Sequence, residues 1–210
     1  MPDCCRNLDE EQIIDTAEQY EFPLFPLNSV LFPTTLLPLR IFEPRYVDLI
    51  GRCMRDNSGF GVIALASGTE IGRPGQTHVV GTIARIVDFD QGPDGLLNIV
   101  IRGHQRIRVL ETITQPDNLL LGHVVELDDV RQLPIPDDYQ ALCKLLNEIS
   151  STVAQTTTTT PASAAELAYG LSQFLPLPIP AKVAVLEIDD TLALLEHVSD
   201  QVQRLQQQGQ

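Results

Sequence analysis

The stretch EFPLFPLNSVLFPTTLLPLRIFEPRY, residues 21–46, decides the architecture of this chain. Proline recurs within its residues 21–41, at positions 23, 26, 33 and 38. Proline has no N–H and fixes φ, so it cannot continue a helix and suits extended backbone at the edge of a sheet. The stretch therefore predicts two extended segments, one over residues 21–27 and one over residues 30–41.

A helix is expected directly after these segments. Pro44 suits the first turn of a helix, and Glu43 beside it lies at the positive end of the helix dipole. The next apolar residues recur at helical spacing and share one face: Tyr46, Val47, Ile50, Cys53 and Met54. The sequence Asn57-Ser58-Gly59 predicts the end of this helix.

Beyond the helix, short apolar and alternating runs are typical of strands. A turn is expected at residues 91–95, and Gly103-His104-Gln105 predicts a second, tight hairpin turn. The expected strands are residues 60–66, 79–90, 97–101, 106–112 and 119–127. The first part of the chain is therefore a β-rich unit with one helix.

The composition changes at residues 128–138, where prolines and acidic residues gather, and every later segment has helical spacing. Ser163 and Glu166 have capping-box spacing for one helix, and Asp190 is placed to cap the last helix. We expect three regions. They are an acidic leader over residues 1–20, a β-rich unit over residues 21–131, and a helical unit over residues 132–210 that packs on it.

Net charge disfavours polyanionic partners. The chain has 210 residues, and 14 Lys and Arg stand against 28 Asp and Glu, which gives a formal charge of −14. Nonspecific binding to nucleic acid or anionic lipid needs a basic surface. Within residues 40–110, Arg102, Arg106 and Arg108 cluster, and they indicate either an anion site or neutralisation of nearby acid.

The sequence shows no signal for a membrane, for export or for a metal. The N-terminus lacks the apolar core of a signal peptide, and prolines interrupt the most apolar stretch, residues 30–41. The cysteines, at positions 4, 5, 53 and 143, and the four histidines lack zinc-ligand spacing. We expect a cytoplasmic protein with free thiols, no metal and no cofactor.

Two blocks of the opening stretch, residues 26–33 and 37–46, closely resemble the amino-terminal substrate-binding domain of the Lon proteases. Later stretches resemble the same family in the same order: Phe60–Ile63, Val80–Ala84, Arg102–Val109 and Phe174–Leu177. The chain looks most like the small stand-alone Lon-domain proteins of bacteria.

This resemblance implies an α+β fold, namely a PUA-like, partly closed β-barrel with one helix, followed by a C-terminal helical bundle. It also implies a role, because this domain helps Lon proteases to recognise polypeptides that other domains unfold and cut. The sequence has neither a nucleotide-binding loop nor a Ser–Lys peptidase motif. We therefore expect a protein that is not an enzyme, with no ATP hydrolysis and no peptide cleavage.

The leading hypothesis is a noncatalytic module that binds polypeptide or a partner protein by apolar contact and by strand addition at a sheet edge. The candidate contacts are Phe32 and Pro33, which are apolar, and Arg40, Glu43 and Arg45, which are polar. The same residues can instead define the fold, with Phe32 in the core and the charged side chains in internal ion pairs. The alternatives are an RNA-binding PUA-like protein and an uncharacterised hydrolase. The sequence specifies neither the partner nor the oligomeric state.

Overall fold

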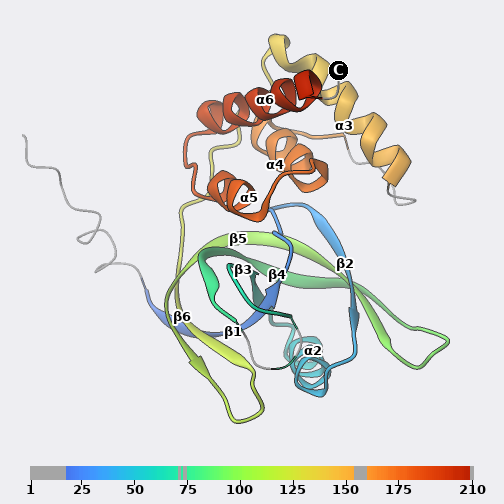
Figure 1. Ribbon diagram of the computed structural model, residues 1–210, viewed down its shortest axis with the longest axis vertical. Coiled ribbons are helices and arrows are strands. Elements are labelled where there is room, and N and C mark those ends of the chain that lie inside the picture. Colours follow the sequence, from blue (N-terminus) through green and yellow to red (C-terminus); the bar gives the residue numbers. More distant parts are fainter. Residues whose placement is uncertain (1–17, 71, 73–74, 154–159, 209–210) are drawn as a thin grey trace, which may run out of the picture.

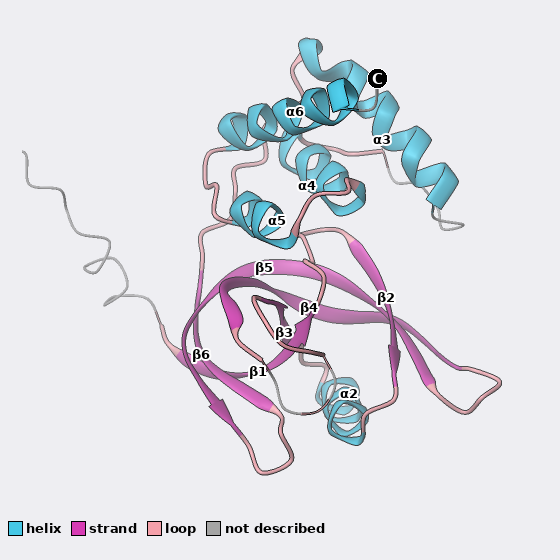
Figure 2. Cartoon of the chain, viewed as in Figure 1, coloured by secondary structure: helices cyan, strands magenta, loops and turns pink. Residues whose placement is uncertain are grey.

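The computed structural model describes residues 18–70, 72, 75–153 and 160–208. Strands fill the first part of the chain and helices the second (Figures 1 and 2). The strands are β1 (Tyr20–Leu27), β2 (Leu36–Ile41), β3 (Phe60–Leu65), β4 (Thr77–Gln91), β5 (Leu97–Thr114) and β6 (Leu120–Glu126). The helices are α2 (Pro44–Asp56), the 3-10 turn η1 (Asp137–Tyr139), α3 (Gln140–Val153), α4 (Ala164–Phe174), α5 (Ile179–Leu186) and α6 (Thr191–Gln208). The predicted leader falls outside the described residues except at its end, where Tyr20 begins β1.

A ring of strands forms a barrel. The order across the sheet is β2-β5-β4-β3-β1-β6, and β5 also pairs with β6, which closes β5-β4-β3-β1-β6 on itself. β1 and β3 are parallel, and the other strand pairs are antiparallel. β2 pairs with β5 outside this ring and so forms an edge of the sheet. The predicted α+β fold, a partly closed barrel followed by helices, is confirmed.

The β4–β5 hairpin projects from the barrel (Figure 1). β4 has 15 residues and β5 has 18, so each is longer than the other strands. Register shifts at Thr82/Ala84 and Ile86/Asp88 bend the pair, as β-bulges do. The predicted turn at residues 91–95 is confirmed and closes the hairpin, with Gly95 at φ 80°.

Helix α2 covers the end of the barrel that faces away from the other helices (Figure 1). Pro44 occupies its first position, and it ends before Asn57, which adopts φ 49°. The prediction of a helix from Pro44 to about Asn57 is thus confirmed. Its inward face packs on barrel residues, in a cluster that includes Tyr46, Leu49, Ile50, Cys53, Phe25, Phe60, Ile99 and Ile101.

Helices α3–α6 gather at the opposite end of the barrel, with α5 next to the strands (Figure 2). Their hydrophobic core also contains residues of the β-rich part: Val30, Phe32, Ala64 and Val80. One apolar cluster therefore continues from the barrel into the helices. The boundary between residues 131 and 132, placed from composition, stays a prediction.

The predicted helix caps are confirmed. Ser163 Oγ accepts a hydrogen bond from the Glu166 amide at 3.2 Å, and the Glu166 carboxylate accepts one from the Ala162 amide at 2.8 Å. Asp190 Oδ1 accepts from the amides of Leu192 and Ala193 at 3.0 and 2.8 Å. These contacts satisfy amide groups that have no partner within the helix.

Arg106 joins the barrel to the helices. Its side chain is only 2% exposed. Its guanidinium donates to the carbonyl oxygens of Leu186 at 2.7 Å, Ile188 at 3.2 Å and Asp128 at 2.6 Å, and pairs with the Asp189 carboxylate at 2.9 Å. Strand β5, the connection after β6 and the turn between α5 and α6 thus meet on one cation. The anion-site hypothesis does not apply to Arg106, because acceptors of the protein itself occupy its donors.

The turn predicted at Gly103-His104-Gln105 is wrong, because β5 runs without a break through these residues. Gly103 instead allows a close approach of backbone. The Thr34 amide donates to the Gly103 carbonyl at 2.8 Å, and the Gly103 amide donates to the Thr35 carbonyl at 3.0 Å. A Cβ at Gly103 would lie 2.1 Å from the carbonyl oxygen of Phe32. The turn of the β5–β6 hairpin lies at residues 115–119, where Asn118 has φ 66°.

We predict that Arg106→Met lowers the free energy of unfolding by about 2–4 kcal/mol, because buried carbonyl acceptors lose their donors. Urea denaturation followed by circular dichroism measures the change. Arg102→Met is the matched control, since Arg102 lies on the exposed side of the same strand, and we expect it to stay within about 0.5 kcal/mol of the wild type. Equal midpoints for the Arg106 and Arg102 variants would contradict this role of Arg106.

We predict opposite effects for two glycine-to-alanine changes. Gly103→Ala should destabilise the chain by more than about 2 kcal/mol, because its Cβ meets the Phe32 backbone. Gly51→Ala, in the middle of α2 with nothing within 4 Å of a Cβ, should stabilise it by about 0.5–1 kcal/mol. Thermal melting of both variants tests this pair, and a Gly103→Ala variant as stable as wild type would show that residues 32–35 do not rest on β5.

Candidate functional site

Phe32, one of the predicted contact residues, lies in the core. It is fully buried, and its ring stacks on Tyr169 of α4 with the ring centroids 5.9 Å apart. The Thr82 hydroxyl donates to the neighbouring Leu31 carbonyl at 2.7 Å and holds the segment against β4. Pro33 is half-buried and forms an isolated bridge with Gly103. In this conformation Phe32 joins the barrel to the helices and offers no surface to a ligand.

Glu43 and Arg45 form a buried clasp beside the start of α2. Arg45 Nη2 lies 2.9 Å from Glu43 Oε2, and the Arg45 side chain is 4% exposed. Arg45 also donates to the carbonyl of Asn118 at 2.6 Å and to that of Glu70 at 3.4 Å. The clasp therefore holds the β5–β6 turn and the loop after β3 against the helix.

The aromatic ring next to the clasp is equally enclosed. The Arg45 guanidinium carbon lies 4.5 Å from the ring centroid of Tyr46, and the same ring stacks on Phe25 with the two ring centroids 3.9 Å apart. Burial raises the pKa of Tyr46 to about 12, so its hydroxyl is neutral at physiological pH. These contacts support the alternative interpretation of the sequence pattern, in which the charged residues of this stretch form internal ion pairs and stabilise the fold.

Arg40, the remaining predicted residue, lies at the surface. Its side chain is 60% exposed and pairs with Asp94 in the turn of the β4–β5 hairpin. Since Arg40 lies on β2, this ion pair connects the edge strand to the projecting hairpin. The structure thus brings Glu43 and Arg45 together and leaves Arg40 and Phe32 at separate places.

Exposed apolar side chains gather where the hairpin meets α2. Phe42 is 52% exposed, Val47 is 41% exposed and Phe89 is 58% exposed. They share an open concavity of about 460 Å³, here called the hairpin groove. Its lining residues are Ile41, Phe42, Val47, Phe89, Asp90, Gln91, Gly95, Leu96 and Leu97. Three large apolar side chains in one concavity are typical of a surface that binds a partner.

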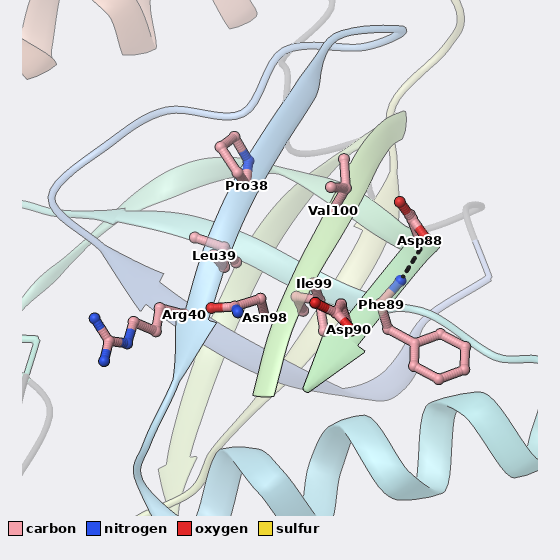
Figure 3. Close-up of a pocket in the computed structure, with 9 residues that line it drawn as sticks. All are labelled: Pro38, Leu39, Arg40, Asp88, Phe89, Asp90, Asn98, Ile99 and Val100. Carbon is pink, nitrogen blue, oxygen red and sulfur yellow. Dashed lines mark hydrogen bonds between the residues drawn. The ribbon is translucent and has the colours of Figure 1, made fainter. Parts of the chain in front are cut away.

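A second concavity, of about 330 Å³, lies across strands β2, β5 and β4 and is here called the outer face. Figure 3 shows its lining residues, which are Pro38, Leu39, Arg40, Asp88, Phe89, Asp90, Asn98, Ile99 and Val100. Phe89 and Asp90 line both concavities. The hairpin groove and the outer face therefore adjoin one another along the end of β4.

Phe89 is exposed because of where it lies on the strand. It pairs with Ile99, which is 1% exposed, so its register is that of an inward-facing residue. The bulge at Ile86/Asp88 and the length of the hairpin carry it past the core. No sequence signal separates such a residue from a buried one, because both occupy apolar positions of an alternating strand.

The described residues contain no group of three or more His, Cys, Asp and Glu that could hold a metal ion.

Burial raises the pKa of both thiols in the described part of the chain, Cys53 and Cys143, which keeps them protonated. Burial lowers the pKa of Lys182, whose Nζ donates to the Gln173 carbonyl at 3.0 Å. No helix in the described ranges is long and apolar enough to cross a membrane.

Solved structures share this architecture. A Lon N-terminal domain protein from Xanthomonas campestris superposes with a TM-score of 0.70 at 31% sequence identity, over 86% of this chain and 98% of that one. The N-terminal domain of the Lon protease of the Mycobacterium avium complex superposes with a TM-score of 0.55 at 18% identity and supports the fold alone.

Curated sequences give the same relationship. The Lon protease of Anaeromyxobacter dehalogenans is 28% identical over 195 residues, which is 87% of this chain and 23% of that protein. The Lon protease of Parabacteroides distasonis is 30% identical over 130 residues, or 61% of this chain and 16% of that protein. The chain thus spans less than a quarter of the length of these two relatives. The family model of the ATP-dependent protease La (LON) substrate-binding domain matches residues 21–204, and the chain belongs to that family.

Proposed function

We propose that this chain is a noncatalytic module that binds extended polypeptide at the hairpin groove and the adjoining outer face. The observation that carries the proposal is the match of residues 21–204 to a substrate-binding domain. A substrate-recognition module of this family has a polypeptide as its partner in general terms. The place of contact is our inference from exposure and chemistry.

The chemistry of the hairpin groove favours an apolar partner surface. Phe42, Val47 and Phe89 expose hydrophobic area to water, and each Å² that a partner covers contributes about 25 cal/mol. An unfolded polypeptide exposes the apolar side chains that a folded protein buries. The groove therefore distinguishes unfolded from folded chains by the availability of those side chains.

Strand addition would supply main-chain hydrogen bonds beside this groove. β2 pairs with β5 on one side, and its other side has no partner among the described strands. Pro38 lies within β2 and has no N–H, so an added strand would gain an incomplete ladder. We infer that apolar contact dominates and that strand pairing contributes orientation.

The remaining parts of the proposal concern catalysis and location. The family model that matches residues 21–204 describes a substrate-binding domain, which supports a role in recognition without catalysis. A cytoplasmic location is supported by the free thiols of Cys53 and Cys143. The charge of −14 favours polypeptide over RNA as the ligand.

We predict that the chain binds a reduced, carboxymethylated protein and does not bind the same protein in its folded form. The double substitution Phe42→Ser/Phe89→Ser should weaken binding at least about tenfold, because burying an aromatic side chain is worth roughly 1.5–3 kcal/mol. Fluorescence anisotropy with labelled polypeptide measures the affinity.

Leu192→Ser is the matched control for this experiment. Leu192 lies on α6 at the other end of the molecule and is 50% exposed, so the change removes a similar exposed apolar group. We expect its affinity to equal that of the wild type. An equal loss of affinity in the control would place the contact outside the hairpin groove. Equal binding of the folded protein would contradict the preference for unfolded polypeptide.

We also predict that the purified chain releases no phosphate from ATP and leaves bound polypeptide intact. The sequence contains no nucleotide-binding loop to hold the phosphates and no Ser–Lys peptidase motif to supply a nucleophile. Phosphate release and gel electrophoresis after long incubation test both activities. Turnover that follows the chain through successive purification steps would contradict the noncatalytic assignment.

A further inference from the structure

The charges around the two concavities are unbalanced. Among all the residues that line the two concavities, the one cation is Arg40, on the outer face. It already pairs with Asp94. Asp88 and Asp90 also line the outer face, and both are exposed. Neither carboxylate forms an ion pair with a described residue. The surface around Phe89 is therefore apolar with a negative edge.

The strand register fixes how these carboxylates lie relative to Phe89. Asp88 pairs with Val100 and Asp90 pairs with Asn98, so both lie on the outer face, two residues apart on β4 (Figure 3). Phe89 lies between them in sequence and lines the hairpin groove as well. Neighbouring side chains on a strand lie on opposite faces, so the side chain of Phe89 lies on the groove side of β4 and the two carboxylates lie on its other side. Because Phe89 and Asp90 line both concavities, an extended segment that runs from the hairpin groove around the end of β4 onto the outer face contacts Phe89 and reaches both carboxylates.

We infer that this surface selects extended polypeptide segments in which Lys or Arg lies beside apolar side chains. The inference rests on the proposed function and specifies the substrate class of the same site. Apolar groups of the segment would cover Phe42 and Phe89, and its cations would meet Asp88 and Asp90. Opposite charges at the rim of an apolar contact steer encounter and reject acidic segments.

The overall charge acts in the same direction. At −14 the chain repels acidic polypeptides and nucleic acid at a distance, and it attracts basic segments. A second copy of the chain would bring the same negative charge and a second pair of carboxylates to the contact. A cationic, apolar polypeptide is thus the occupant that the charges favour.

Two peptides with the same length and apolar residues, one with Lys where the other has Glu, test the selectivity by fluorescence anisotropy. We expect the Lys peptide to bind about three- to tenfold more tightly at low ionic strength, as two exposed ion pairs allow. The difference should shrink as salt is added, because exposed charges are screened. The variant Asp88→Asn/Asp90→Asn should remove most of the difference and leave binding of the Glu peptide unchanged or stronger.

Asp137→Asn/Asp138→Asn is the matched control, because it removes two exposed carboxylates at η1 and changes the net charge equally. This control should keep the preference for Lys. An equal effect of both variants would assign the preference to net charge and overturn the site.

The remaining outcomes separate this inference from the proposed function. Equal affinity for the Lys and Glu peptides would overturn the charge selectivity while polypeptide binding stands. Failure of both peptides and of the carboxymethylated protein to bind would overturn the proposed function and this inference with it. Concentration-dependent dimerisation in analytical ultracentrifugation that Phe89→Ser abolishes would assign the surface to a second copy and overturn the inference.

Discussion

The two halves of this chain depend on one buried cation. Arg106 reaches from β5 to the carbonyls of Asp128 and Leu186, which belong to the connection after the barrel and to the end of α5. Buried carbonyl groups need donors, and a side chain with five N–H groups satisfies several at once. Around it, the apolar cluster that contains Phe32 and Tyr169 continues from barrel to helices. The orientation of the helices thus follows from strand β5.

The closure of the barrel decides where a binding surface can lie. Strands in the ring use both edges for pairing, whereas β2 and the end of the β4–β5 hairpin lie outside it. Phe89 has the register of a residue that faces the core, but it lies on the projecting part of the hairpin and remains 58% exposed. The exposed apolar surface therefore results from the length of two strands.

The sequence was informative where local rules decide the structure. Pro44 and Asn57 begin and end α2 as their residue types predict, and Ser163 caps α4. Prediction from the sequence failed where a residue contacts a segment that is distant along the chain. Gly103 resembles a turn glycine, yet it makes room for the backbone of residues 32–35, which lie some 70 positions away in the chain.

The same limit applies to the candidate site. Arg45 and Arg40 are both arginines near the start of α2, and no local pattern reveals that the first is buried against Asn118 while the second is exposed. Partners distant in the sequence decide that difference. Phe89 lies between two aspartates in an alternating strand, a local pattern that is the same for a buried residue. Its exposure depends on where the barrel ends.

This arrangement separates the residues that hold the fold from those of the proposed binding surface. Arg106, Arg45 and Phe32 make their contacts with other residues inside the molecule. Phe89, Asp88 and Asp90 lie near the end of β4, in the hairpin that projects from the barrel (Figure 1). Substitutions at exposed positions of a surface strand usually change the free energy of unfolding by no more than about 0.5 kcal/mol. Under the proposed function, substitutions on the hairpin would change what the chain binds, while the barrel holds the hairpin in place.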